Sequence, residues 1–228
     1  MRRILLLILL LTLLGCTTTR TAFLHIEAGD ILVDYGEGFV QAIDGMDLNV
    51  NDIIKTKDTV ATIVLYESIF IDLAENTELT ILDLTKKHPR VYQTGSTWTK
   101  FSGLLGIESF TVETSDTVST VRGTEFGVDD EGVEVGEGEV EVEIDQIKHS
   151  IKAGERLQLE SQPEPMFDYG AFDEDAAPMM FEYESAPAPK LEKQFSIRKL
   201  DDQESSRVQK KMQKSRERVE KLKSAGLI

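Results

Sequence analysis

Apolar and polar residues alternate along much of the first 160 residues, a pattern typical of β-strands that bury one face. The strictest case is Glu139–Ile144, where three carboxylates alternate with three aliphatic side chains. Residues 59–65, 68–73 and 79–84 are rich in the same β-forming apolar residues. Gly, Asp and Asn between these segments favour turns. The pattern therefore predicts short strands joined by tight connections.

No segment of convincing helical period interrupts residues 22–160. Short strands at close spacing, without helical crossovers, are typical of a β-sandwich, a roll or a short solenoid. We therefore predict a single all-β domain over residues 22–160.

The composition changes at Ser161. Residues 161–189 contain five of the six prolines together with many acidic residues, so we predict an acidic, disordered linker. Its scattered aromatic and methionine residues leave two interpretations open, a solvated spacer or a motif that docks a partner.

Residues 190–228 are predicted to hold a basic amphipathic helix, because 203–224 is dense in helix formers and contains no Gly or Pro. Apolar positions at spacings of four and three form one narrow stripe, flanked by Lys and Arg. Such a helix could contact an anionic membrane, an acidic protein or the acidic β domain of its own chain. The stripe consists of Val208, Met212, Ser215, Val219 and Leu222.

The N-terminus has the pattern of a secretory leader. Two arginines precede an apolar run at 4–14, which is too short for a membrane span of about twenty residues. We predict a signal peptide over residues 1–15.

Leu-Leu-Gly-Cys16 resembles the lipobox at which bacterial-type lipoproteins are acylated and cleaved, and Cys16 is the only cysteine. The alternative is an ordinary secretory signal with an incidental cysteine. A single thiol cannot form an internal disulfide in an oxidising compartment. We therefore predict lipidation of Cys16 and a short tether over 16–21. The expected location is extracytoplasmic, anchored by lipid to a membrane of the cell envelope.

Charge is unevenly distributed within a net of −16. Residues 108–184 carry 22 acidic and 4 basic side chains, whereas 190–228 carry 6 acidic and 12 basic ones. Net acidity argues against nucleic acid as the partner, since neutralisation of phosphates supplies most of that affinity.

A six-residue motif, V-R-G-T-E-F at 121–126, is followed about a dozen residues later by G-E-V at 138–140. This combination resembles the FecR domain, and weaker similarity of the flanks extends over about 21–160. The residues that carry the resemblance are Val121, Arg122, Gly123, Thr124, Glu125, Phe126, Gly138, Glu139 and Val140.

These motif residues are predicted to be mainly structural. Gly123 permits a backbone angle that a side chain would forbid, and Val121 and Phe126 are apolar anchors on either side of it. Arg122 with Glu125 is predicted to form a clamp between neighbouring strands. The alternative makes Arg122 a receptor for an anionic ligand.

In iron-dicitrate-type signalling, FecR proteins join a cytoplasmic anti-sigma segment and a membrane helix to this β domain. The resemblance implies an extracytoplasmic binding domain, but here the lipoprotein leader stands in place of those two segments, so direct control of a sigma factor is not expected. The expected function is a non-enzymatic binding module, a sensor or a scaffold, with an envelope protein as partner. Alternatives are a structural or adhesive surface lipoprotein and a polysaccharide hydrolase.

No catalytic, cofactor or metal motif stands out. The three histidines are scattered, and no nucleophile, zinc or phosphate-loop signature occurs. The carboxylates at 129–131 and Glu137 could gather calcium, but the spaced calcium-loop pattern is missing and a solvated turn is favoured. Trp98 could form a sugar platform or belong to the core. No enzyme activity, cofactor or metal is expected.

Overall fold

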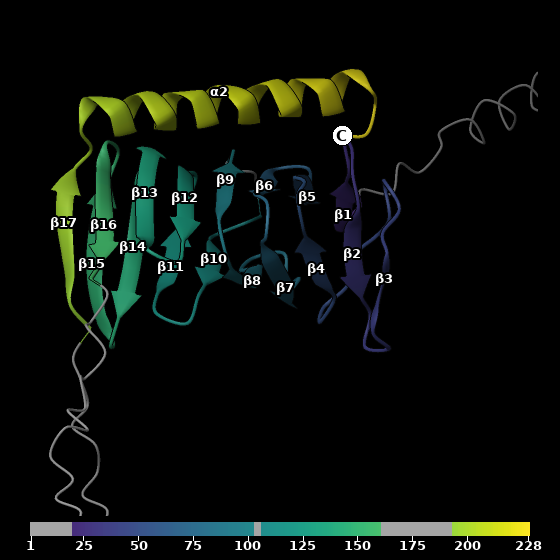
Figure 1. The fold of residues 1–228 in the computed structure, drawn as a ribbon, viewed down its shortest axis with the longest axis horizontal. Helices are drawn as coiled ribbons and strands as arrows, with labels where there is room; N and C mark the ends of the chain where they lie inside the picture. Colours follow the sequence, from purple (N-terminus) through teal and green to yellow (C-terminus); the bar gives the residue numbers. More distant parts are fainter. Residues whose placement is uncertain (1–19, 103–105, 161–192) are drawn as a thin grey trace, which may run out of the picture.

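The computed structural model describes residues 20–102, 106–160 and 193–228, which Figure 1 shows as a ribbon. The alternating segments form two facing sheets, and one long helix crosses the strands of one sheet. The predicted all-β domain with a C-terminal helix is confirmed, and among the predicted architectures the structure is a sandwich.

The strands divide between an eight-stranded and a nine-stranded sheet. The eight-stranded sheet has the order β1 (Ala22–His25), β5 (Ala61–Leu65), β6 (Ile69–Leu73), β9 (Thr97–Phe101), β12 (Glu125–Asp129), β13 (Gly132–Glu137), β16 (Glu155–Leu159) and β17 (Phe195–Lys199). The nine-stranded sheet has the order β15 (Ile147–Lys152), β14 (Glu139–Ile144), β11 (Val118–Val121), β10 (Phe110–Glu113), β8 (Arg90–Thr94), β7 (Glu78–Asp83), β4 (Ile53–Thr56), β2 (Ile31–Asp34) and β3 (Phe39–Gln41).

The chain advances along the sandwich by passing back and forth between the two sheets. β1, β2 and β3 therefore lie at one end, and β15, β16 and β17 at the other (Figure 1). The main hydrophobic core fills the space between the sheets and runs from Leu24 near one end to Leu157 near the other. The result is an elongated, solenoid-like sandwich with two distinct ends.

The predicted strands are confirmed with small shifts at their ends. Alternation at 59–65, 68–73 and 79–84 corresponds to β5, β6 and β7, and β14 has the bounds predicted for it. In β14 the aliphatic residues are buried and Glu139 and Glu141 are exposed, as a half-buried strand requires.

The predicted end of the β domain at Glu160 is wrong. β17 follows the predicted linker and pairs antiparallel with β16, with Ile197 opposite Leu157. The strand escaped prediction because it is short and lies at an edge, and its partner is distant in the sequence. The predicted linker at 161–189 lies outside the described residues.

The helix, α2 (Asp202–Ser224), begins one residue before the predicted segment 203–224, and the part of 190–228 before it holds β17 rather than helix. A capping box fixes its start: the Glu204 N–H donates to Asp201 and the Asp201 N–H donates to Glu204, at 2.8 and 3.0 Å. The predicted stripe is confirmed as the buried face of α2.

α2 lies on the outer face of the eight-stranded sheet, across its strands (Figure 1). Two small apolar clusters hold it there. Val219 and Leu222 pack on Phe23, Val64 and Phe70, and the other cluster joins Val208 and Met212 to Trp98.

Candidate functional site

The V-R-G-T-E-F motif is the connection by which the chain passes from the nine-stranded to the eight-stranded sheet. Val121 ends β11 and Phe126 lies in β12, and both side chains are buried in the main core. Gly123 between them has φ +89°, a left-handed backbone angle that favours glycine. The motif thus builds the turn that links the two layers.

The second part of the motif, at 138–140, lies directly beside the first. Val140 is opposite Val121 in the pairing of β11 with β14. The Thr124 hydroxyl donates to the Glu139 carbonyl at 3.0 Å, and a Cβ at Gly138 would lie 3.0 Å from that hydroxyl oxygen. The V-R-G-T-E-F and G-E-V segments are therefore held together by the Thr124 hydrogen bond and by close packing at Gly138.

The predicted Arg122–Glu125 clamp is wrong. Glu125 is 2% exposed; it accepts from Trp98 Nε1 at 3.2 Å and from Lys100 Nζ at 3.0 Å. Arg122 is exposed, and the described residues provide it with no hydrogen-bond or ion-pair partner. The cause is the turn at Gly123, because Arg122 precedes the crossover and Glu125 follows it onto the other sheet.

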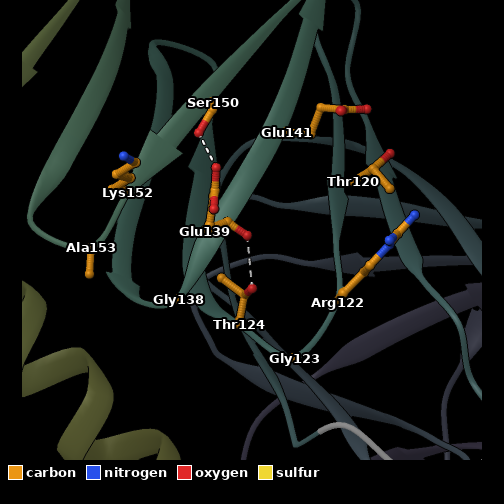
Figure 2. Close-up of a pocket in the computed structure, with 10 residues that line it drawn as sticks. All are labelled: Thr120, Arg122, Gly123, Thr124, Gly138, Glu139, Glu141, Ser150, Lys152 and Ala153. Atoms are coloured by element: carbon orange, nitrogen blue, oxygen red, sulfur yellow. Dashed lines mark hydrogen bonds between the residues drawn. The ribbon is translucent and has the colours of Figure 1, made fainter.

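Arg122 borders an open hollow of about 720 Å³ formed with β11, β14 and β15 (Figure 2). Its rim carries two cations, two carboxylates and three hydroxyl groups, with glycine backbone at its base. Ser150 donates to Glu139 within it. The lining comprises Thr120, Arg122, Gly123, Thr124, Gly138, Glu139, Glu141, Ser150, Lys152 and Ala153.

The hollow can recognise a charged or polar surface by hydrogen bonds and ion pairs. It contains no His or Cys among its lining residues. Arg122, held at the mouth by a rigid turn and lacking a described partner, offers five donors to an incoming carboxylate or carbonyl group. Among the described sites, this hollow is the one that is both lined by residues of the V-R-G-T-E-F motif and rich in polar groups that can bind a partner.

The other candidate residues of the sequence lie apart from this hollow. The histidines are separated: His25 contacts Asp44, His88 contacts Ser109, and His149 packs edge-on against Phe195. Trp98 lies under α2 rather than on an open platform. Cys16 lies outside the described residues.

The acidic turn at 129–131 is also engaged by protein groups. Asp129 pairs with Arg156 at 2.9 Å, and Asp130 accepts the Gly95 N–H at 2.9 Å. Among the described residues, no group of three or more His, Cys, Asp or Glu side chains is arranged to hold a metal ion.

A second polar surface lies under α2, where the helix contacts the acidic β domain of its own chain; the sequence left this contact as one of three alternatives and did not predict the individual pairs. Carboxylates on the outer face of the eight-stranded sheet each meet a helix cation: Lys211 pairs with Glu134, Arg216 with Glu125, and Arg218 with Asp72. Burial raises the pKa of Asp72, against the opposing effect of the Arg218 charge. Local sequence contains no signal for these pairs, because each joins residues far apart in the chain.

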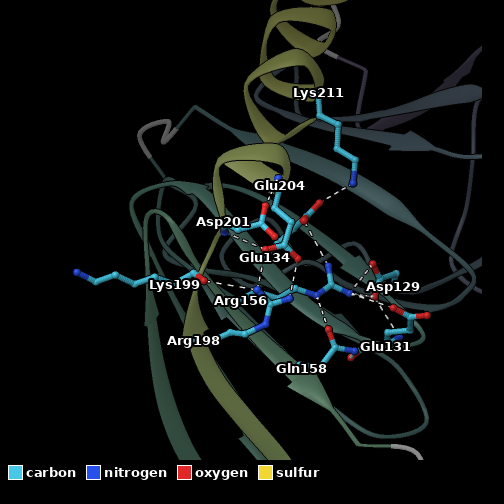
Figure 3. A network of polar contacts seen from close by, with 10 residues as sticks. All are labelled: Asp129, Glu131, Glu134, Arg156, Gln158, Arg198, Lys199, Asp201, Glu204 and Lys211. Carbon is cyan, nitrogen blue, oxygen red and sulfur yellow. Dashed lines mark hydrogen bonds and ion pairs between the residues drawn. The ribbon is translucent and has the colours of Figure 1, made fainter. Parts of the chain in front are cut away.

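At the start of α2 lies a network of polar contacts in two adjoining parts, one around Arg156 and the other between Arg198 and Glu204 (Figure 3). Arg156 is buried and reaches Asp129 and Glu134, while Arg198 forms two bonds of 2.6 Å with Glu204. The Arg198 guanidinium and the Asp201 N–H together lower the pKa of Glu204 to about 2. The network joins β13, β16, β17 and the first turn of α2.

Residues 52–143 match the family model described as FecR protein. The match includes the whole V-R-G-T-E-F segment and the G-E-V segment. The chain carries a FecR domain. This domain covers strands β4 to β14, so the hollow beside Arg122 is built mainly from FecR-domain residues.

Two solved structures are similar to part of the chain. Both are crystal structures of a candidate anti-sigma factor from Parabacteroides distasonis ATCC 8503, at 2.50 and 1.65 Å resolution. Each is 21% identical, with a TM-score of 0.42, over 46% of this chain and 53% of the other. The chain thus spans about half the length of those structures. No curated protein matches it.

No helix among the described residues is both long enough and apolar enough to cross a membrane.

Proposed function

We propose that this protein is a lipid-anchored, extracytoplasmic FecR-domain module that binds another envelope protein through the hollow beside Arg122, as a sensor or a scaffold. The observation that carries the proposal is the position of Arg122 within the FecR motif. Its neighbours Val121, Thr124, Glu125 and Phe126 are buried, whereas Arg122 is exposed at the mouth of the hollow.

The chemistry of the hollow supports binding rather than catalysis. Its carboxylates have partners of their own: Glu139 accepts from Ser150, and Glu141 pairs with Lys148 at 2.7 Å. The Ser150 hydroxyl is bonded to the Glu139 carboxylate, but the lining holds no histidine to act as its base and no cysteine nucleophile. An exposed guanidinium over such a rim suits an acidic or carbonyl-rich protein surface.

The anchoring part of the proposal rests on the leader and Cys16. In living cells, Cys16→Ser should abolish incorporation of labelled fatty acid and leave the protein unprocessed or released from the membrane. Unchanged labelling and membrane association of Cys16→Ser would contradict the lipid anchor.

The binding part is tested by crosslinking in intact cells, followed by capture of the full chain. Arg122→Glu should lose a discrete crosslinked envelope protein that the parent retains. Arg207→Glu is the matched control, because Arg207 is also exposed but lies on α2, and no described residue forms an ion pair with it. Point variants are preferable to a chain ending at Glu160, which would also remove β17 from its sheet.

The proposal predicts that Arg207→Glu and the parent give the same crosslinked partner. If Arg122→Glu captures that partner as well as the parent does, the hollow is not its binding site. Equal melting temperatures of the two variants would show that the difference comes from contact and not from misfolding.

A further inference from the structure

The two ends of the sandwich leave strand edges uncovered by any described strand. β3 is the last strand of the nine-stranded sheet at one end, and β15 is the last at the other. In the eight-stranded sheet the edge at β1 is partly covered, since the Leu24 N–H donates to the Met46 carbonyl at 3.0 Å. Open edges are ready templates for pairing with another strand.

At the β3 end, apolar side chains that face the core extend as far as the edge strand, and those on the edge strand are exposed. Val40 lies opposite Val33 and so shares its face of the sheet, the face that lines the core. Val33 is fully buried, whereas Val40 is 48% exposed. Ile43, just after β3, is 74% exposed. Apolar side chains at the end of a stacked fold are typical of a missing neighbour, because a closed end carries a polar cap.

The opposite end shows the same feature in both sheets. Ile147 in β15 lies opposite the buried Ile144, and Ile197 in β17 lies opposite the buried Leu157. These two isoleucines continue the core rows, yet they are 61% and 43% exposed. At both ends, therefore, apolar side chains on the core face are exposed next to a strand edge that is unpaired among the described residues.

The two ends differ in charge. At the β3 end, residues 30–47 contain five acidic side chains and no Lys or Arg. At the other end, β15 and β17 carry four cations and no acidic residue. Two of these cations, Lys152 and Lys199, form no ion pair with any described residue. The acidic residues are Asp30, Asp34, Glu37, Asp44 and Asp47, and the cations are Lys148, Lys152, Arg198 and Lys199.

We infer that copies of this chain associate head to tail, with the β3 end of one copy seated against the β15–β17 end of the next. The contact buries Val40 and Ile43 against Ile147 and Ile197, and it lets β3 pair with β15 so that the nine-stranded sheet continues between copies. The same chain carries both complementary surfaces, which identifies the partner as a second copy.

The charges select this arrangement over a symmetric one. Asp47 and Asp44 are already paired with Arg20 and His25, and Lys148 and Arg198 with Glu141 and Glu204. Contact between two β3 ends would still bring together Asp30, Asp34 and Glu37 of both copies, which have no described ion-pair partner. Contact between two β15–β17 ends would likewise bring together Lys152 and Lys199 of both copies. Opposite ends attract instead. A head-to-tail contact does not close on itself unless a ring forms, so it predicts growth beyond a dimer.

The test uses the full chain in non-ionic detergent, with its protein mass measured by light scattering after size-exclusion chromatography. Val40→Asp blocks one end, and Ile147→Asp blocks the other, by placing a charge where an apolar side chain would be buried. Val118→Asp is the control, because Val118 is an exposed aliphatic residue in β11, a strand inside the sheet.

The parent and Val118→Asp should increase in mass with concentration. Val40→Asp alone and Ile147→Asp alone should remain monomeric, whereas their equimolar mixture should reach twice the monomer mass and stop there. A parent that stays monomeric overturns the inference. A blocked variant that still dimerises alone also overturns it, since only contact between like ends could produce that dimer. Circular dichroism confirms that each variant is folded.

Discussion

Neighbouring residues of the FecR motif have opposite environments. Glu125 is buried with Trp98 and Lys100, whereas Arg122 is exposed beside the hollow. The turn at Gly123 separates the two side chains, although they are three residues apart in the sequence. Spacing alone suggested an ion pair, because a sequence does not show that the chain changes sheets between them.

Glu125→Gln should destabilise the protein, whereas Arg122→Gln should not. The first change keeps an acceptor for Trp98 but removes the charge that faces the largely buried Lys100 and also Arg216. Loss of one member of a buried charged hydrogen bond costs about 1–3 kcal/mol. An exposed substitution is usually within about 0.5 kcal/mol. Urea unfolding of both variants measures the difference, and equal free energies of unfolding would contradict the assignment.

Asp72 should give the protein a distinctive dependence of stability on pH. Burial raises its pKa in the folded state above the ordinary value of 3.8, so the folded protein binds more protons than the unfolded chain in the interval between those values. As pH rises through that interval, Asp72 therefore makes the parent progressively less stable. Asp72→Asn cannot titrate and lacks this effect.

The free energy of unfolding of Asp72→Asn minus that of the parent should thus increase as pH rises above 3.8. Removing the partner of Arg218 adds a constant penalty but does not change the sign of the slope. Urea titrations at a series of pH values measure it. A difference that is flat or falls with pH would mean that the Arg218 charge outweighs burial.

The helices and strands that were predicted correctly are those whose formation depends on residues close together in the sequence. The alternation of β14 and the stripe of α2 are set by the periods of strand and helix, and both were predicted within a residue or two. β17 was not predicted, and contact of α2 with its own β domain was left as one of three alternatives, because each depends on contacts across the chain. β17 has five residues and one partner strand, and its sequence pattern of apolar and polar residues does not differ from that of an extended loop.

Met212→Asp should release α2 from the sheet and expose Trp98. Met212 packs on Trp98, the only tryptophan in the chain, so its fluorescence reports directly on the docked helix. An aspartate there cannot be buried without a large desolvation cost. Trp98 emission should shift to longer wavelength while the strand signal in circular dichroism is retained.

Gln209→Asp is the matched control, because Gln209 is exposed on the same helix and the change carries the same cost in helix propensity. Its emission should equal that of the parent. A Met212→Asp variant with unshifted emission would show that the Trp98 cluster is not needed to hold α2.

In the whole molecule, the basic C-terminal segment of the sequence lies against the acidic β domain. The acidic strands present carboxylates outward, and the basic helix lies across them with a cation beside several of these groups. The exposed pairs among them, Arg216 with Glu137 and Lys221 with Glu27, stabilise weakly, each by about 0–1 kcal/mol. The two apolar clusters under α2 are small compared with the core between the sheets. The helix should therefore be the less stable layer.

Urea should consequently unfold the protein in two steps that different probes separate. Trp98 emission should change at lower urea than the far-UV circular dichroism of the strands, since detachment of α2 breaks only its own interface. The strands share one continuous core and should unfold together afterwards. Overlapping transitions from the two probes would mean that α2 and the sandwich form one cooperative unit. The buried pairs of Glu125, Glu134 and Asp72 would then contribute more to docking than their exposed partners suggest.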